Sequence, residues 1–310
     1  MVGKAARHPP MHRVPLAELR AAMPRQLSSG LPREAVGEVE DRDIAGPRGP
    51  IGLRVYRPAV PGGGEGDEPR PPLTLFFHGS GFTICSLDTH DAICRQICNR
   101  SGTLVVSVDY RLAPENPFPA GPEDCWAATV WAAGHAEALG ARPGPLAVCG
   151  DSAGGTMAAL VALRARDAGG PAIGAQLLLY PVTDHYAAGH PSFDERGAGC
   201  GMTREDMRWF WDQYLPDPSL AGRADVSPAR APDLSGLPPT YVAIAEYDVL
   251  RDEGELFARR LGEAGVPVTL RRYPTMNHGF LHWVGVVEAA GDAMNDLGGW
   301  LRNTFTAGER

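Results

Sequence analysis

A serine stands in the middle of a run of small residues at positions 150–155. The run reads Gly-Asp-Ser-Ala-Gly-Gly, so Ser152 has a glycine two residues before it and another two residues after it. An apolar stretch, 145–150, leads into it, and a helical pattern, 153–168, follows it. In a sharp strand-to-helix turn the central side chain projects above the sheet, and small neighbours prevent backbone collisions. The pattern predicts a nucleophilic serine at a helix N-terminus, where negative charge is favoured.

A serine hydroxyl needs a general base and a third group that orients this base. His278 follows the candidate last strand, 268–274, and Asp248 ends another predicted strand, 240–248. Both side chains would then lie at the carboxyl edge of the sheet, where open α/β sheets assemble their sites. Asp252 is the alternative acid, although its place at a helix start also suits a dipole partner. We predict His278 as the base and Asp248 as the acid.

Acyl transfer also needs hydrogen-bond donors for a developing oxyanion. The sequence His-Gly-Ser-Gly-Phe, 78–82, ends a predicted strand, and its small residues let backbone N–H groups face the site. We predict Ser80 and Gly81 as donors from this loop and Ala153 as the third donor. His78 competes for the role of base, but at a strand end in a glycine-rich loop we expect it to brace the loop.

No metal or organic cofactor is expected, because serine, histidine and an oxyanion hole suffice for acyl transfer. The six cysteines are scattered and form no CxxC pair, which suits a reducing compartment. Cys94 and Cys98 would share a helical face, but no pair of histidines accompanies them in the sequence, so we predict no metal site there.

The elements that must position these residues alternate along the chain. Helical patterns between short apolar runs predict a doubly wound α/β fold with a parallel sheet and right-handed crossovers. The runs are 73–79, 103–110, 145–150, 175–181 and 240–248, and the clearest helical patterns are 88–100, 122–139 and 153–168. Before them, 35–44 and 51–58 alternate like an antiparallel hairpin at one edge of the sheet.

The alternation breaks between residues 182 and 225, where no strand is predicted. Residues 202–215 read as an amphipathic helix with Thr203 as its N-cap. Its aromatic side chains would either pack into the core or form a lid over a pocket, and residues 1–33 could join such a lid. The candidate pocket residues are Phe82, Trp209, Phe210 and Tyr214. With no second core in view, we expect a single domain over 1–310.

Composition limits the classes of partner. The net charge of -8 argues against a nucleic-acid partner, because phosphate binding needs a concentrated basic surface. No apolar stretch reaches the ~20 residues that span a bilayer. The first twenty residues contain no apolar core of a signal peptide. We therefore expect a cytoplasmic protein that binds no membrane.

Taken together, the motifs resemble the hormone-sensitive-lipase-like family of α/β-hydrolases, also called bacterial family IV esterases. The resemblance covers the chain from about residue 45 to the end. It rests on five ordered segments: 78–82, 109–124, 150–155, 246–254 and 277–280. It implies the α/β-hydrolase fold, with a mostly parallel eight-stranded sheet, flanking helices and a helical cap built from about 1–33 and 182–225.

The resemblance also implies roles for individual residues. Ser152, Asp248 and His278 would form the triad, and Ser80, Gly81 and Ala153 the oxyanion hole. Two positions depart from the family. Where the family has a glycine, Ser80 brings a Cβ and a hydroxyl close to the oxyanion loop, and Val249 replaces the proline that usually follows the acid. The arginine and acids of 109–124 are expected to tie that loop together rather than to react.

The expected function is a serine carboxylesterase that hydrolyses small, short-acyl esters through an acyl-enzyme. An amidase or a deacetylase of a specialised metabolite would use the same residues and stays open. Plant gibberellin receptors resemble this family but have lost the histidine, which is present here as His278. A small-molecule ester is therefore the expected partner, and family members suggest a possible homodimer through the last strand.

Overall fold

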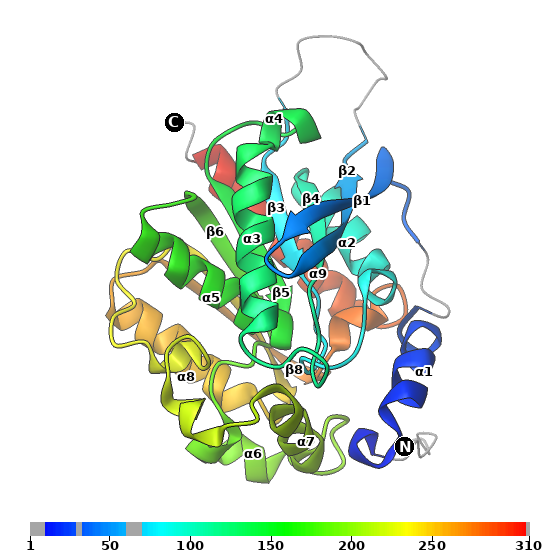
Figure 1. Ribbon diagram of the computed structural model, residues 1–310, viewed down its shortest axis with the longest axis vertical. Helices are drawn as coiled ribbons and strands as arrows, with labels where there is room; N and C mark the ends of the chain where they lie inside the picture. The colour runs from blue at the N-terminus through cyan, green and yellow to red at the C-terminus, as the bar shows by residue number, and fades with distance from the viewer. Residues whose placement is uncertain (1–9, 29–32, 60–69, 308–310) are drawn as a thin grey trace.

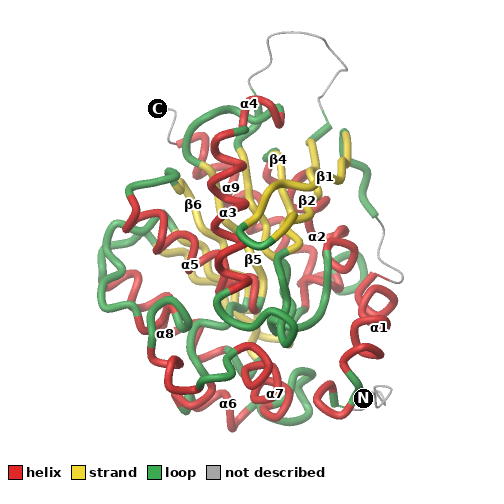
Figure 2. Tube along the Cα trace, in the orientation of Figure 1, coloured by secondary structure: helices red, strands yellow, loops and turns green. Residues whose placement is uncertain are grey.

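The computed structural model describes residues 10–28, 33–59 and 70–307, and these ranges contain one eight-stranded sheet. Its strands follow the order β1-β2-β4-β3-β5-β6-β7-β8 (Figures 1 and 2). Their bounds are β1 (Glu38–Gly46), β2 (Gly49–Arg57), β3 (Leu73–Phe77), β4 (Leu104–Asp109), β5 (Leu146–Asp151), β6 (Ile173–Leu179), β7 (Thr240–Tyr247) and β8 (Val268–Asn277). Each predicted strand is confirmed to within a few residues.

The sheet is parallel except at the edge formed by its first two strands. β1 and β2 pair as an antiparallel hairpin, with Glu38 opposite Arg57, and β2 runs antiparallel to β4. All remaining neighbours are parallel. Both the predicted hairpin and the mostly parallel eight-stranded sheet that the resemblance implied are confirmed. The parallel strands therefore all end at one edge.

Helices cover both faces of this sheet. Those described are α1 (Leu16–Ser28), α2 (Leu87–Ser101), α3 (Ala120–Gly134), α4 (Ala136–Leu139), α5 (Ala153–Ala168), α6 (Pro191–Glu195), α7 (Arg204–Tyr214), α8 (Arg251–Glu263) and α9 (Glu288–Ala307). Short 3-10 turns are η1 (Met11–Arg13), η2 (Tyr186–Ala188), η3 (Pro218–Gly222), η4 (Pro228–Arg230) and η5 (Phe280–Trp283). The helix predicted over 122–139 is divided at His135 into α3 and α4.

Alternate residues of the strands separate the core into two layers. Leu75 packs in one apolar cluster with residues of α3, α5 and α8, whereas its neighbour Phe76 packs in the other with residues of α2 and α9. This alternation is the two-residue period of a strand. Because both layers are apolar, the inner strands β3 to β7 are buried on both faces, which is why their sequences read as nearly continuous hydrophobic runs.

Segments distant in sequence meet beyond the carboxyl ends of the strands, where α1, α6 and α7 lie (Figure 1). As predicted, 182–225 contains helices and no strand, and Thr203 caps α7 by accepting the N–H of Asp206. His12 contacts Asp206 through its ring Nδ1, at 2.8 Å. The N-terminal segment is thus joined to α7, although residues 1–9 and 29–32 of the expected cap lie outside the described ranges.

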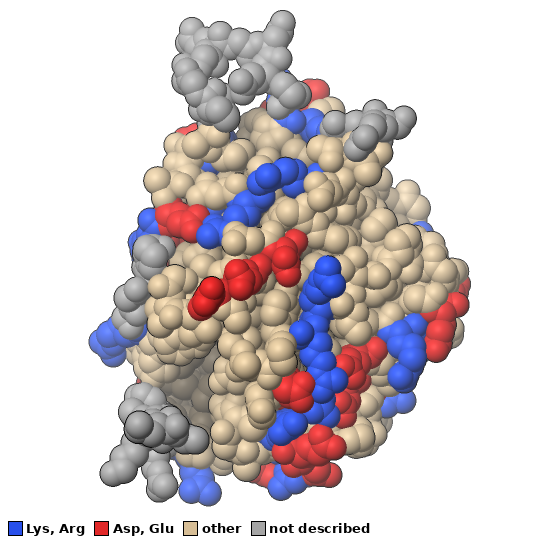
Figure 3. Space-filling view, turned by 180° about the vertical axis from the view of Figure 1, so that it is seen from behind, with Lys and Arg blue, Asp and Glu red and all other residues tan. Residues whose placement is uncertain are grey.

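Two surface properties accompany this fold. In the part of the chain that the structure describes, no helix is both long enough and apolar enough to cross a membrane. On the face that Figure 3 draws, Lys and Arg side chains lie interspersed with Asp and Glu side chains, and wide areas carry neither. This face therefore presents charges of both signs rather than one continuous basic field.

Candidate active site

Ser152 lies in the turn that joins β5 to α5. Its backbone adopts φ 53° and ψ -122°, an unusual conformation for a residue with a side chain. The turn holds because the Ser152 N–H donates to the Leu179 carbonyl at 2.8 Å. A Cβ on Gly154 would collide with the carbonyl oxygen of Phe77, and one on Gly150 with the carbonyl of Gly154. The flanking glycines are therefore required by close backbone approach.

Three predicted residues come together at the ends of three strands. The Nε2 atom of His278, which follows β8, lies 2.9 Å from the Ser152 hydroxyl. Its Nδ1 atom lies 2.7 Å from Oδ2 of Asp248, which follows β7. The other carboxylate oxygen of Asp248 accepts the N–H of Leu250 at 3.0 Å. The imidazole is thus held between a hydroxyl and a buried carboxylate, as a proton acceptor for the hydroxyl must be.

The alternative acid, Asp252, lies in other contacts. Its carboxylate accepts the N–H of Ser192 at 2.7 Å and the Nε–H of Arg251 at 2.7 Å. The bond to Ser192 joins α8 to α6, and the bond to Arg251 lies within α8. The structure brings Asp248, and not Asp252, to the imidazole.

The electrostatics of His278 follow from this arrangement. Burial disfavours the charged imidazole, but the charge and the hydrogen bond of Asp248, with a contribution from Asp151, outweigh this effect and raise the pKa of His278 above its ordinary value. A raised pKa means that the imidazole holds a proton taken from the serine more firmly.

The loop after β3 is held by two hydrogen-bond systems. The N–H of Gly79 donates to Oδ1 of Asp151 at 2.6 Å. The Ser80 hydroxyl lies 2.7 Å from the Tyr110 hydroxyl and accepts the N–H of Phe82 at 2.9 Å. Tyr110 in turn donates to the carbonyl of His78 at 2.7 Å. The Ser80 hydroxyl is therefore used to fix the loop.

The three predicted oxyanion donors keep their backbone N–H groups available. Within the described ranges, no group accepts the N–H of Ser80, Gly81 or Ala153. For Ala153 this follows from its place as the first residue of α5, where helical N–H groups have no partner. Gly81 has φ +51°, and a Cβ there would collide with the ring of Phe210.

His78 lies beneath this loop. Its ring stacks on that of Tyr110 with centroids 4.6 Å apart. Burial, with the nearby His90, lowers the pKa of His78 to about 3, so its ring is neutral. It is His278, and not His78, that contacts Ser152 and Asp248.

A cavity of about 270 Å³ opens over Ser152 and His278. Its apolar walls come from the N-terminal segment, the loop after β3 and α7, and include Met11, Met23, Leu27, Ile84, Met202 and Phe210. A larger cavity of about 540 Å³, between α3, α5 and the chain after η4, contains none of the predicted site residues. The predicted site residues therefore lie at the smaller cavity.

The predicted pocket aromatics need a correction. Of the four, only Phe210 lines this cavity. Phe82 and Tyr214 stack on each other with ring centroids 4.0 Å apart, and both are buried. Trp209 packs against Phe210. These three belong to the packing beneath α7 rather than to the cavity wall, because an amphipathic pattern marks a buried face without saying what covers it.

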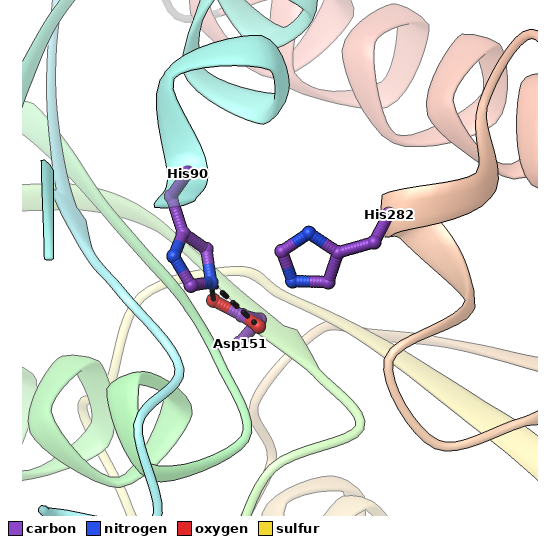
Figure 4. Close-up of side chains that lie close together, drawn as sticks. All are labelled: His90, Asp151 and His282. Atoms are coloured by element: carbon purple, nitrogen blue, oxygen red, sulfur yellow. Dashed lines mark hydrogen bonds and ion pairs between the residues drawn. The ribbon is translucent and has the colours of Figure 1, made fainter. Parts of the chain in front are cut away.

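Sequence reasoning missed several residues at the site. His90 of α2 lies 3.2 Å from Asp151, and His282 of η5 lies close to both (Figure 4). Arg20 of α1 binds Glu115 through both terminal nitrogens, at 2.8 Å each. The expected tie within 109–124 was found, since Arg111 pairs with Asp124 at 2.7 Å. The only sequence signals for the missed contacts were the residue types themselves.

Comparisons with known proteins agree with this geometry. Residues 74–282 match the model of a family described as the α/β hydrolase fold. Esterase LipI of Mycobacterium tuberculosis is 46% identical over 276 residues, which cover 87% of this chain and 84% of LipI. Ethyl acetate hydrolase of Pseudomonas putida is 35% identical over 247 residues, 78% of this chain and 75% of that protein.

The solved structure of an esterase from Pyrobaculum calidifontis superimposes with a TM-score of 0.87 at 38% identity, covering 94% of each chain. This match and the eight-stranded sheet with its helices establish the fold. The family model and the sequence relatives establish the lineage that the motifs resembled. The chain belongs to the α/β-hydrolase fold family, in its hormone-sensitive-lipase-like branch.

Proposed function

We propose that this carboxylic ester hydrolase is a serine carboxylesterase that cleaves small, short-acyl esters through an acyl-enzyme. The observation that carries the proposal is the continuous chain of contacts from Ser152 through His278 to Asp248, at 2.9 and 2.7 Å. The esterases similar to this chain support the reaction class.

In the proposed reaction, the Ser152 oxygen attacks the ester carbonyl carbon while its proton passes to Nε2 of His278. Asp248 keeps the other ring proton on Nδ1 and stabilises the imidazolium. The negative charge on the former carbonyl oxygen is held by the N–H groups of Ser80, Gly81 and Ala153. Collapse of this tetrahedral intermediate expels the alcohol, which takes the proton from Nε2. Water then attacks the acyl-serine through the same proton transfers and releases the acid. Every step uses only groups of the chain, the substrate and water.

The size of the cavity supports the choice of short acyl groups. About 270 Å³ is small beside the roughly 300–1,000 Å³ of typical small-molecule sites. Residues 1–33 and 182–225 would act as the cap, since Met11, Met23 and Phe210 from these segments contribute to the cavity walls. A longer acyl chain would have to displace these side chains, and their packing contacts would be lost.

A chain-length series tests the proposed substrate class. We expect p-nitrophenyl esters of two to six carbons to be hydrolysed with the highest kcat/KM, and twelve-carbon esters poorly. Matched anilides would be hydrolysed much more slowly, because expulsion of an amine needs protonation at nitrogen. Equal rates on anilides would instead favour the amidase, and a maximum at twelve carbons would contradict the short-acyl assignment.

A further inference from the structure

Three buried side chains beside the turn that carries Ser152 take no part in the proposed acyl transfer. His90 comes from α2, Asp151 from the end of β5 and His282 from η5. Each offers one metal-ligating atom, and these atoms lie within 4.8 Å of one another. Figure 4 shows the two rings converging on the carboxylate from different elements. All three residues also line the cavity over Ser152.

The hydrogen bonds around His90 leave two arrangements for its ring protons. The Thr89 hydroxyl lies 2.7 Å from the Ser86 carbonyl and 2.8 Å from Nδ1 of His90, and it accepts the Ser86 N–H at 3.0 Å. Its single proton goes either to the Ser86 carbonyl, so that the Nδ1–H of His90 donates to the hydroxyl, or to Nδ1 itself. Nε2 faces Oδ1 of Asp151 at 3.2 Å. A bare lone pair against a carboxylate is repulsive, so a proton or a metal ion must lie between them.

The geometry of this pair suits a metal ion. Tetrahedral Zn²⁺ with bonds of about 2.0–2.1 Å places its ligand atoms roughly 3.3 Å apart. The separation of Nε2 of His90 and Oδ1 of Asp151, 3.2 Å, matches this spacing. Metal-binding histidines also donate their other ring N–H to an acceptor that fixes the ring, and Nδ1 of His90 faces such an acceptor in the Thr89 hydroxyl.

His282 supplies the third ligand. In Figure 4 its Nε2 atom faces Asp151 and His90, whereas its Nδ1 atom points away from them and is buried without a hydrogen-bond partner among the described residues. The adjoining cavity offers an entry path and space for a water as fourth ligand.

We propose that His90, Asp151 and His282 bind a divalent transition-metal ion, best matched by Zn²⁺, in the wall of the substrate cavity. When the ion binds, it takes the place of the proton between Nε2 of His90 and Oδ1 of Asp151, the displaced proton passes to Nδ1 or to solvent, and Nε2 ligates through its lone pair. Asp151 also holds the Gly79 N–H at 2.6 Å, so the ion acts on the oxyanion loop. It is inhibitory rather than catalytic, because it occupies space beside Ser152 and pulls on the carboxylate that orders this loop.

Calorimetric titration of the metal-free full chain with Zn²⁺ tests this site independently of any esterase activity. We expect one ion per chain, with affinity reduced about 10-fold or more in His282→Gln and in His90→Gln. His135→Gln is the matched control, since His135 is exposed between α3 and α4. This variant should bind Zn²⁺ with the affinity of the wild type. Thermal unfolding checks that each variant is folded. If His90→Gln does not fold, the affinity of His282→Gln alone decides the test.

Two further readouts separate this site from others on the chain. Bound Co²⁺ should give the visible bands of a tetrahedral nitrogen and oxygen site without the charge-transfer band of a thiolate, which excludes the cysteines. Zn²⁺ should inhibit ester hydrolysis over the concentrations at which it binds, and less so in His282→Gln relative to that variant's own metal-free rate. Absence of stoichiometric binding, or equal affinity and inhibition in wild type and His282→Gln, would overturn the proposal.

Discussion

Replacing Asp248 by asparagine tests the proposed acid through the tautomer of His278. The Asp248 side chain is only 2% exposed, so the amide has little freedom. Its oxygen would keep accepting the Leu250 N–H, and its NH₂ group would then donate to Nδ1 of His278. The ring proton would move to Nε2, the atom 2.9 Å from the Ser152 oxygen, which could then no longer accept the serine proton.

The expected loss in kcat is about 10,000-fold, the cost of the wrong tautomer in a serine, histidine and aspartate site. This corresponds to about 5 kcal/mol of transition-state stabilisation, at 1.36 kcal/mol for each factor of ten. The assay is p-nitrophenyl acetate hydrolysis at saturating substrate, with thermal unfolding as a check on the fold.

Asp252→Asn is the matched control, since it removes the carboxylate of the alternative acid. Its bond to Ser192 joins α6 to α8, and its bond to Arg251 lies within α8, so we expect a loss of about 1 kcal/mol in the free energy of unfolding and little change in kcat. The reasoning fails if Asp248→Asn keeps more than a tenth of the wild-type rate, or if Asp252→Asn loses as much.

The remaining predictions concern pH, the loop after β3, the turn that carries Ser152 and the N-terminal helix α1. Values of kcat/KM should fall as pH drops through the raised pKa of His278, because the protonated ring cannot accept the serine proton; a flat profile from pH 8 to 5 would exclude it as the base. Ser80→Gly should cost about 1–3 kcal/mol in urea unfolding, since Phe82 N–H loses its acceptor, and should alter the acyl-chain profile; an unchanged value and profile would show that the hydroxyl is dispensable. Gly154→Ala should abolish activity, because its Cβ collides with the Phe77 carbonyl, and an active variant would mean that the turn is looser than described. Arg20→Gln should raise KM more than it lowers kcat, because α1 forms a cavity wall without touching the reacting atoms; the reverse pattern in steady-state kinetics would contradict this.

The sequence predicted the parts of the site that chemistry and strand order determine together. Ser152, Asp248 and His278 each lie at the end of a predicted strand, and parallel strands bring such positions to one edge. The glycines around Ser152 could be assigned because only a tight turn needs them. Gly81 was predicted as an oxyanion donor and stays a prediction; its φ of +51° favours glycine, and its closeness to Phe210 could not be foreseen.

Contacts between distant segments were beyond that reasoning. His12 meets Asp206 across 194 positions, and Arg20 meets Glu115 across 95. No local pattern encodes such pairs, because they depend on how the N-terminal segment lies against the sheet edge. The aromatic residues of α7 were over-assigned to the pocket for a related reason: periodicity identifies the buried face, and only the packed structure shows that Tyr214 meets Phe82.

The cluster of His90, Asp151 and His282 could not be predicted from local sequence patterns either. Asp151 reads in sequence as one residue of a glycine-rich turn, and His90 as one polar residue of an amphipathic helix. Their 3.2 Å contact arises because β5 ends beneath the first turn of α2. Proximity in three dimensions, and not residue type, makes this group a candidate metal site.

The most direct test of the proposed acyl-enzyme is mass spectrometry of the protein quenched in acid during turnover of p-nitrophenyl acetate. The account predicts one added acetyl group per chain, located by peptide mapping on Ser152, and none in a folded but inactive Ser152→Ala variant. An acetyl group on another residue, or hydrolysis that continues at most of its rate in Ser152→Ala, would contradict it.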